Sequence, residues 1–290
     1  MGDQSTDLPI FQSTNVPDTK GDTMFHPLFD LTGRVALVSG AAQNMGRSSA
    51  IALAEIGADL LITDINEPGL LDTAETIRKL GRRVVPAVYD VWDEAQIRAM
   101  YQQVDREFGR IDIVANIPGA NILGHPEEIT LEHFTKVLNA TLVSKFVSCQ
   151  EAGRRMLAAG KGSIINMSSI GGVRALGRGN FAYSVGQAGV IQMTRELSTE
   201  WADRGVRVNA IAPAQITNPG FDVRMDNTPG LRERFLRGLP MGRLGVPDDI
   251  KGVVMFLASD ASGYVTGTVL PFDGGNLAMG ANATIGRSEA

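Results

Sequence analysis

The sequence predicts a single α/β domain in which a parallel sheet is covered by helices on both faces. Short apolar runs, many of them rich in β-branched residues, alternate with helical patterns along most of the 290-residue chain, as a doubly wound sheet requires. Glycines stand at the ends of several of these runs and follow no regular repeat. Residues 29–275 contain no linker-like stretch, which favours one domain over two.

Each element follows from a local pattern. A strand is expected where a short apolar run is bounded by turn residues, and a helix where apolar residues recur every three to four positions. Gly57 and Gly81 follow the first two helical patterns, where C-terminal caps are common. The expected strands are 34–39, 59–63, 83–89, 112–115, 163–167, 206–212 and 269–272. The expected helices are 47–56, 67–80, 93–108, 131–159, 181–204 and 248–259.

Composition argues against several classes of function. The net charge is −5, from 27 basic and 32 acidic residues, whereas nucleic-acid binders normally carry a basic surplus. One cysteine excludes a disulfide framework, and three scattered histidines without an HExxH motif predict no metal site. No apolar run reaches the roughly 18 residues of a membrane span. The single cysteine and the lack of a signal-peptide pattern favour the cytoplasm.

The first glycine-rich turn predicts a site for a pyrophosphate. Residues 39–46 follow the first expected strand and open the first expected helix, so backbone N–H groups and the positive end of the helix dipole face one ligand. A tight turn without a ligand is the alternative, because two glycines alone are a weak signal. The candidate contacts are Gly40, Gln43, Asn44, Met45 and Gly46.

The second strand ends at Asp64, where an acidic side chain can accept hydrogen bonds from the ribose hydroxyls of an adenosine. The same charge repels a 2′-phosphate and therefore favours NAD over NADP. The alternative is an ordinary capping aspartate, since Asn66 and Glu67 follow. Further candidate cofactor contacts near the ends of the second, third and fourth strands are Ile65, Asp90, Val91, Asn116 and Gly119.

These motifs resemble those of the short-chain dehydrogenase/reductase family over about residues 29–275. The family's T-G-x-x-x-G-x-G motif corresponds to residues 39–46, its N-N-A-G motif to 116–119 and its Y-x-x-x-K motif to 183–187. Further matches are Asn139, Ser169, residues 209–214 and the closing stretch 240–275. The resemblance implies a Rossmann-like NAD(P)-binding catalytic domain at 29–276, oxidoreductase activity on alcohols or ketones, and a homo-oligomer, either a dimer or a tetramer.

The chain departs from the family pattern at four places. Asn44 replaces the middle glycine of the first motif, and asparagine tolerates a positive φ at modest cost. Gln187 replaces the catalytic lysine, so that a hydrogen bond to the ribose is kept but the charge is lost. The other departures are Ile117 with Pro118 beneath the nicotinamide ribose, and Ala214 with Asn218 in a segment where Pro213, Ile216 and Asn218 are expected to contact the cofactor.

The candidate catalytic residues are Asn139, Ser169, Tyr183 and Gln187. Tyr183 and Gln187 are four positions apart on one expected helix and therefore share a face. By the resemblance, Ser169 polarises the substrate oxygen and Tyr183 exchanges its proton as hydride moves to or from the nicotinamide. Asn139 supports a water-mediated proton path, and Gln187 orients the ribose. A free tyrosine has a pKa near 10, so an alkaline optimum is expected without the lysine charge.

The loss of the lysine leaves two other functions open: a nucleotide-binding protein without catalysis, and elimination chemistry without net redox change. Residues 217–239 are expected to form a lid over a small-molecule substrate. Three arginines near the site (Arg174, Arg178 and Arg224) suggest an anionic or sugar-like substrate, although exposed loop positions are the alternative.

Two further residues are expected to lie apart from the chemistry. His125 is either at the entrance or simply on the surface, and Cys149 has no neighbouring base to make it a nucleophile. Residues 1–28 and 277–290 are expected to be tails, unless Ile10, Phe11 and Phe25 form an arm that packs on a neighbouring subunit. Association is expected through the helices at 131–159 and 181–204.

Overall fold

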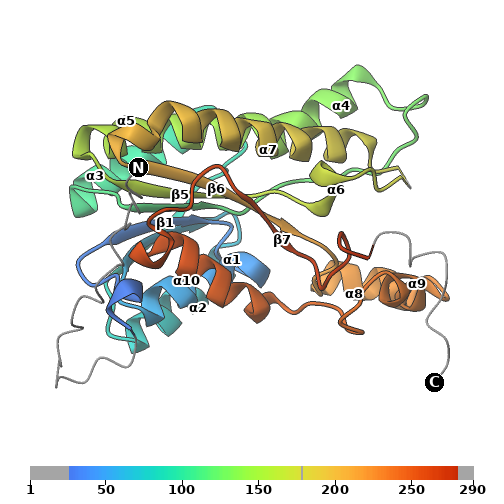
Figure 1. Cartoon of the computed structure of the whole chain (residues 1–290), viewed down its shortest axis with the longest axis horizontal. Helices are drawn as coiled ribbons and strands as arrows, with labels where there is room; N and C mark the ends of the chain where they lie inside the picture. Colours follow the sequence, from blue (N-terminus) through green and yellow to red (C-terminus); the bar gives the residue numbers. More distant parts are fainter. Residues whose placement is uncertain (1–25, 178, 280–290) are drawn as a thin grey trace, which may run out of the picture.

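The sheet confirms the predicted fold class. A computed structural model describes residues 26–177 and 179–279, and within them the strands form one parallel sheet in the order β3-β2-β1-β4-β5-β6-β7 (Figure 1). The proposed arm residues Ile10, Phe11 and Phe25 lie outside the described residues. The strands are β1 (Val35–Ser39), β2 (Asp59–Asp64), β3 (Val84–Val88), β4 (Ile113–Asn116), β5 (Gly162–Met167), β6 (Val206–Pro213) and β7 (Val269–Phe272).

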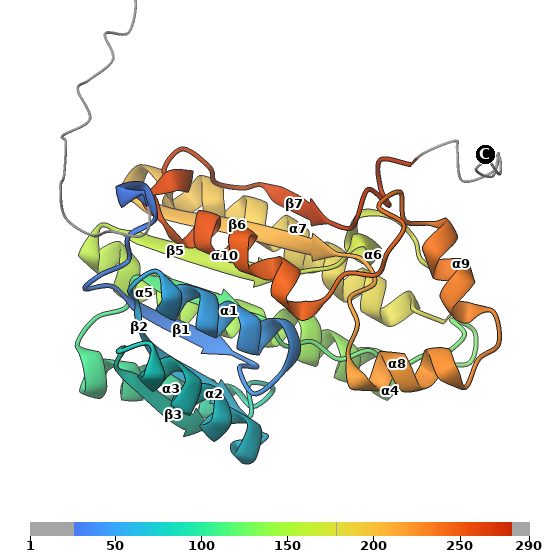
Figure 2. The ribbon, with the colours of Figure 1, turned by 90° about the horizontal axis from the view of Figure 1, so that it is seen from below.

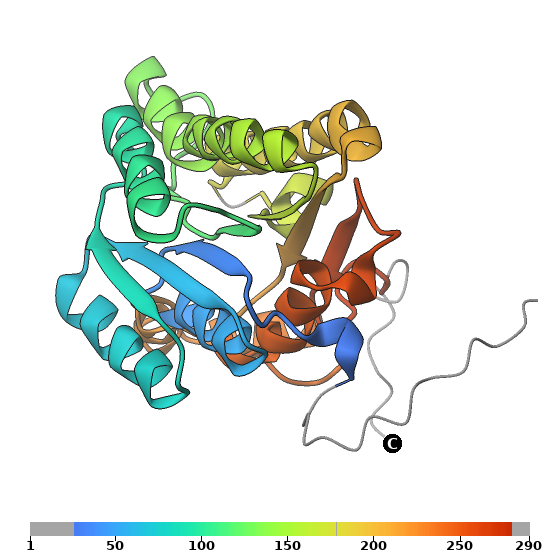
Figure 3. The ribbon, with the colours of Figure 1, turned by 90° about the vertical axis from the view of Figure 1, so that its left-hand side faces the viewer.

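Helices cover both faces of the sheet (Figures 1 and 3). One face carries α1 (Asn44–Glu55), α2 (Glu67–Lys79) and α10 (Lys251–Ala258), which Figure 2 shows from below. The other face carries α3 (Glu94–Phe108), α4 (Leu131–Leu138), α5 (Ser144–Ala159) and α7 (Phe181–Trp201). Three short helices lie towards the carboxyl ends of the strands: α6 (Ile170–Val173), α8 (Pro219–Asp226) and α9 (Leu231–Arg237).

The central strands are mostly apolar because both of their faces are covered. Every residue of β1, β4 and β5 is buried. Side chains alternate between the two faces, so Val38 packs with the α1 side and Leu37 with the α3 side. Each layer therefore has its own core, and the sheet between them is held rigidly enough to fix the positions of its strand ends.

The helix expected at 131–159 contains an interruption. A π-helical turn, Asn139–Val143, separates α4 from α5. Within this turn the Thr141 hydroxyl donates to the carbonyl of Val137 at 2.7 Å. The turn lies close against α7, since a methyl group on Gly186 would come within 2.2 Å of the Thr141 hydroxyl. Such turns are frequent at functional sites, and the spacing of apolar residues alone gives no sign of one.

Three other helices differ from the expectation by three residues at one end. Helix α1 begins at Asn44, three residues before the expected start, so its N-terminus is part of the glycine-rich turn itself. The helix expected at 181–204 ends at Trp201 and continues as a tight turn, Ala202–Arg204. The helix expected at 248–259 begins at Lys251, after a tight turn, Pro247–Ile250. Only the first difference affects the site, because it aims the start of α1 at the strand ends.

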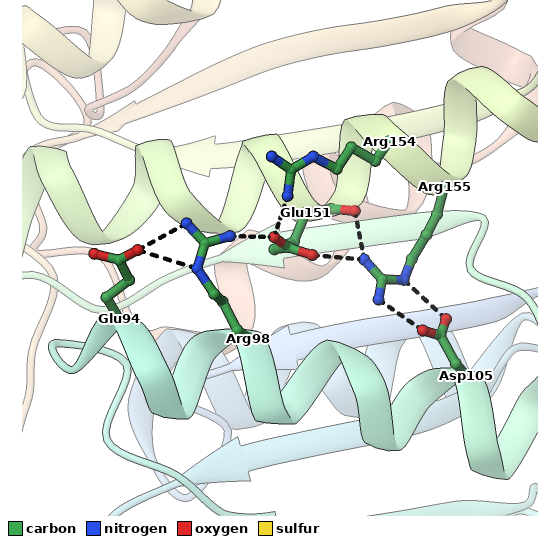
Figure 4. Close-up of polar contacts among 6 residues, drawn as sticks. All are labelled: Glu94, Arg98, Asp105, Glu151, Arg154 and Arg155. Carbon is green, nitrogen blue, oxygen red and sulfur yellow. Dashed lines mark hydrogen bonds and ion pairs between the residues drawn. The ribbon is translucent and has the colours of Figure 1, made fainter.

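An ion-pair network ties α3 to α5 on the side of the sheet away from α1 (Figure 4). Glu151 accepts hydrogen bonds from three guanidinium groups, those of Arg98, Arg154 and Arg155. Burial raises the pKa of Glu151, but the three guanidinium groups outweigh it, so the pKa lies below its ordinary value. The network continues to Glu94 on one side and to Asp105 on the other. It fixes the two helices that stand behind the site.

Candidate functional site

The site lies at the carboxyl ends of the central strands. From β1 the chain proceeds to β2 in one direction and later to β4 in the other, and this switch point is where parallel α/β sheets bind ligands. Two cavities adjoin there, of about 420 Å³ and about 310 Å³. Both are lined by Asn44, Met45, Ile117 and Gly119, so one elongated ligand can occupy both.

The larger cavity collects most of the residues that the sequence suggested for the cofactor. Asn66 also lines this cavity, as do the aromatic rings of Tyr89 and Trp92, which no sequence motif indicated. The predicted residues found on its wall are Gly40, Gln43, Asn44, Met45, Gly46, Asp64, Ile65, Asp90, Val91 and Gly119.

The glycine-rich turn keeps its shape despite the asparagine. Asn44 has a φ of 51°, and no other non-glycine residue in the described ranges has a positive φ. Gly46 lies directly beneath the turn, because a methyl group there would be 1.8 Å from the carbonyl oxygen of Gly40. The residue preceding α1, Gln43, makes no side-chain cap. The first N–H groups of α1 are therefore available to an anionic ligand.

Asp64 joins the turn to the end of β2. One of its carboxylate oxygens accepts from the backbone N–H of Ala42 at 3.1 Å, and the other accepts from Asn66 at 2.9 Å. The carboxylate is thereby held at the cavity wall, where its remaining acceptor positions and its charge face a ligand. A carboxylate in this position is suited to accept hydrogen bonds from ligand hydroxyl groups.

The smaller cavity brings together Ser169, Tyr183 and Gln187, with Pro213, Ile216 and Asn218 on its opposite side. Ser169 precedes α6, and its oxygen accepts from the N–H of Gly171 at 3.1 Å. The hydroxyl proton can be donated to the Tyr183 phenol oxygen or to a ligand. Burial raises the pKa of the Tyr183 phenol above its ordinary value, and the side chains of Ser169 and Gln187 offset only part of that rise.

Gln187 is 3% exposed and firmly placed. The backbone carbonyl oxygen of Gln187 accepts a hydrogen bond from the Ser168 hydroxyl at 3.0 Å. A methyl group on Gly172 would lie 2.7 Å from the Gln187 backbone. Its side-chain oxygen Oε1 is buried and has no hydrogen-bond partner within the described part of the chain. A buried acceptor without a partner is costly, so this oxygen marks a position where a ligand hydroxyl or a water would be bound.

Two predicted site residues lie elsewhere. Asn139 is exposed and lines neither cavity. Thr141, in the same π-helical turn, is buried, and its methyl carbon would lie 3.6 Å from a methyl group on Gly119. Asn116 is buried, and its amide accepts from Ser148 and donates to Asn166. It therefore links β4 to α5 and β5 inside the protein and lines neither cavity.

The other residues considered for chemistry lie outside the cavity walls. Arg174, Arg224 and His125 are exposed and line neither cavity, and Arg178 lies outside the described residues. Cys149 is buried, and burial raises the pKa of its thiol to about 12, which rules out a reactive thiolate at neutral pH.

Two residues near the site were not found by sequence reasoning. Thr141 and Lys145 both come from the segment around the π-helical turn, and both are buried. Lys145 lies one helical turn after Thr141, and its ammonium donates to the carbonyl of Pro118. The sequence does contain a signal for Lys145: it stands at a position where the helical pattern predicts a buried apolar residue.

The expected lid is a pair of helices with a small core of its own. Asn218 caps α8, since its side chain accepts from the N–H of Phe221 at 3.0 Å. The rings of Phe221 and Phe235 lie 5.1 Å apart and join the two helices. The core consists of Met225, Leu231, Phe235, Leu239 and Leu244.

The described ranges contain neither a metal-binding cluster nor a membrane-spanning helix. No cluster of three or more His, Cys, Asp or Glu residues there is placed to hold a metal ion. None of the helices there has both the length and the apolar character to cross a membrane.

Comparison with known proteins gives consistent matches. Residues 40–276 match a family model described as enoyl-(acyl carrier protein) reductase. The chain is 37% identical over 249 residues to D-threitol dehydrogenase of Mycolicibacterium smegmatis, covering 85% of this chain and 94% of that enzyme. It is 34% identical over 260 residues to levodione reductase of Leifsonia aquatica, covering 87% and 97%.

A solved structure from Agrobacterium tumefaciens, proposed to be a 2-deoxy-D-gluconate 3-dehydrogenase, holds NADP. It matches this chain with a TM-score of 0.80 and 30% identity, covering 87% of this chain and all of that one. The similarity extends over the sheet and both helical layers, so the whole described domain shares this architecture.

The turn geometry yields a first prediction. We expect Gly46→Ala to weaken NADH binding at least 10-fold and to destabilise the protein by about 2–3 kcal/mol, because the added methyl group displaces α1 from the turn. Fluorescence titration with NADH and thermal unfolding measure the two effects. Gly252→Ala in α10 is the matched control, since a methyl group there meets no atom within 4 Å. Equal behaviour of the two variants would contradict the prediction.

Proposed function

This chain belongs to the short-chain dehydrogenase/reductase family, and we propose that it is an NAD-dependent oxidoreductase that interconverts a secondary alcohol and a ketone. The observation that carries the proposal is the adjacency of the two cavities. Ser169 and Tyr183 line the cavity that continues directly into the one with the glycine-rich turn and Asp64. A hydride donor or acceptor bound along both cavities is thereby brought to a polarised substrate oxygen.

The residues present suit NAD. The uncapped start of α1 is suited to the pyrophosphate, Asp64 to the adenosine ribose, and Gln187 to the second ribose, where its unpartnered oxygen accepts a hydroxyl. Gly119, Pro213, Ile216 and Asn218 surround the nicotinamide end in this proposal. When bound, NAD supplies the hydride acceptor, and NADH supplies the hydride.

Proton transfer falls to the chain's own residues. In alcohol oxidation, the Ser169 hydroxyl donates a hydrogen bond to the substrate oxygen. The Tyr183 phenolate removes the hydroxyl proton as the C–H bond breaks and the carbonyl forms. In ketone reduction, the Tyr183 phenol returns that proton. Asn139 has no part in this scheme, because its side chain lies away from both cavities.

The substrate that fits best is neutral and polar. Among the described residues, which leave out Arg178, no lysine or arginine lines the smaller cavity, whose polar side chains are hydroxyls and amides. Carboxylate capture would call for a cation at that wall, so we favour a polyol or a hydroxyketone over the anionic substrate suggested by the loop arginines. The similarity to a D-threitol dehydrogenase supports this choice.

A second candidate function is nucleotide binding without catalysis, and Gln187 is the observation that favours it. A buried phenol without an adjacent cation is a weak base at neutral pH. Elimination without redox change would use Ser169 and Tyr183 as well. It would also require the Tyr183 phenol to act as a base without an adjacent cation. The pH dependence of turnover separates these functions from the oxidoreductase.

We further propose a cytoplasmic homo-oligomer, either a dimer or a tetramer. Val143, Phe146 and Val185 are 45%, 46% and 40% exposed on the helical layer that contains α4, α5 and α7. Apolar side chains gathered on neighbouring helices are typical of surfaces that a second subunit covers. A free buried Cys149 suits a reducing compartment.

Cofactor choice is tested by fluorescence titration with NADH and NADPH. We expect NADH to bind more tightly, and Asp64→Asn to reduce the preference by roughly 10-fold, because removal of the charge removes the repulsion of a 2′-phosphate. Glu67→Gln, which removes a nearby charge outside the cavity, should leave the preference unchanged. Tighter NADPH binding by the unaltered protein would overturn the assignment, and binding of neither would overturn the oxidoreductase proposal.

Substrate class is tested with a panel of neutral polyols and the corresponding sugar acids. We expect kcat/KM to be at least 10-fold higher for the polyols, since a buried carboxylate would find no cation in the smaller cavity. The panel is measured with NAD at alkaline pH. Higher kcat/KM for the sugar acids would show that the lid brings an arginine to the substrate.

The pH profile tests the role of Tyr183. Because the phenol has a raised pKa and acts as a base in oxidation, kcat/KM should rise with pH through the alkaline range. Gln187→Lys should move this rise to lower pH by about two units, since a cation beside the phenol favours the phenolate. Tyr183→Phe should abolish it. An unchanged profile in Gln187→Lys would mean that Tyr183 is not the titrating base.

A further inference from the structure

Lys145 is a buried lysine without an acidic partner. Its side chain is 3% exposed, and no ion pair among the described residues includes it. Its ammonium donates to the carbonyl of Pro118 and, at 3.3 Å, to that of Thr141. Burial of an unpaired cation costs stability, so a structural role alone gives little reason for a lysine here.

The ammonium lies directly behind the floor of the site. Pro118 and Gly119 line the larger cavity, and Gly119 also lines the smaller one. A methyl group on Gly119 would lie 3.5 Å from Gln187 Nε2 and 3.8 Å from Lys145 Nζ. The amide from α7 and the ammonium from α5 therefore approach the same backbone position from two different helices.

Both side chains have hydrogen-bonding capacity left over. The ammonium has a third N–H beyond the two that its carbonyl partners take. The buried Gln187 Oε1 has no partner in the described ranges. The Gln187 amide lies next to Gly119 on one side, and its side chain lowers the pKa of Tyr183 on the other, so it stands between the ammonium and the tyrosine.

We propose that Lys145 supplies to this site, from α5, the positive charge that position 187 lacks. It acts as a positioning residue: its charge favours the Tyr183 phenolate and holds Gln187 towards the ribose. This inference rests on the proposed function, because it assigns Tyr183 the role of a base. The family pattern places a lysine at position 187 on α7, whereas in this chain the lysine is on the neighbouring helix α5.

The surroundings permit a charged lysine at neutral pH. Burial lowers the pKa of Lys145 to about 8, so most of the ammonium remains protonated at pH 7. The titratable groups near it are Cys149 on its own helix and Tyr101 on α3, whose hydroxyl bonds to Ser148. Tyr183 lies beyond Gln187, whose side chain lowers the pKa of the phenol. Burial raises the pKa of Cys149 and of Tyr101, so neither provides a negative charge in this range.

The test compares Lys145→Met, Gln187→Lys and the double variant with the unaltered protein. In general, a unit charge at about 10 Å from a titrating group shifts its pKa by roughly one unit at an effective dielectric of about 20. We therefore expect Lys145→Met to move the alkaline rise of kcat/KM up by about one unit and to lower turnover roughly 10-fold at neutral pH. The double variant should recover most of the loss, because a cation is restored on α7. Lys136→Met, at an exposed position of α4, is the matched control and should change neither.

A second readout does not depend on turnover or on a cofactor. The phenolate absorbance of the protein alone is titrated for each variant with and without Tyr183→Phe, so that the difference reports Tyr183. Lys145→Met should raise that pKa by about one unit. An unchanged value would overturn the inference even if the enzyme proposal holds. If no nicotinamide cofactor binds, the enzyme proposal fails while this titration still decides the role of Lys145.

Folding is checked by thermal unfolding. If Lys145→Met does not fold, Lys145→Gln serves in its place, because it keeps an amide donor near the Pro118 and Thr141 carbonyls without the charge. The same upward shift in the Tyr183 pKa is expected from this variant, and its absence would contradict the role of the charge.

Discussion

The close approach of α1 to the end of β1 is the constraint on which the site depends. Gly46 lies against the carbonyl of Gly40 with no room for a methyl group, and Asn44 takes up the positive φ that closes the turn. This contact aims the start of α1 at the switch point of the sheet. The charge of Asp64 and the strand ends are useful only because that turn holds a ligand between them.

The second half of the site depends on helices that lock one another in place. The Gln187 backbone is fixed by Ser168 and by the close crossing of α6, while Gly186 allows Thr141 to approach α7. Tyr183 is thereby held at a set distance from Ser169 in a poorly hydrated position. Such fixed geometry is what proton transfer requires, and it also explains why small changes of charge near this wall should matter.

The fold could be predicted almost entirely from the sequence, whereas the site could be predicted only in part. Buried parallel strands such as β1 and β5 appear as apolar runs, and the glycine-rich turn and Asp64 follow strands at fixed offsets. Asn139 is exposed outside both cavities, and motif spacing does not show which residue of the π-helical turn faces inward. Lys145 was missed because a buried cation resembles an ordinary surface lysine until its neighbours are known.

The paired helices α8 and α9 have a consequence for how this protein could change. They have a core of their own, and the pairing of Ile216 and Thr217 with Gly245 closes the base of the segment that carries them. Hydrogen bonds from Met241 to Gly274 and from Asn276 to Gly238 tie this segment to the chain after β7. Substitutions inside that small core need not disturb the sheet or the cofactor cavity. Preference for one alcohol over another can therefore drift in this unit while the chemistry beneath it stays the same, so a single scaffold can be adapted to many substrates.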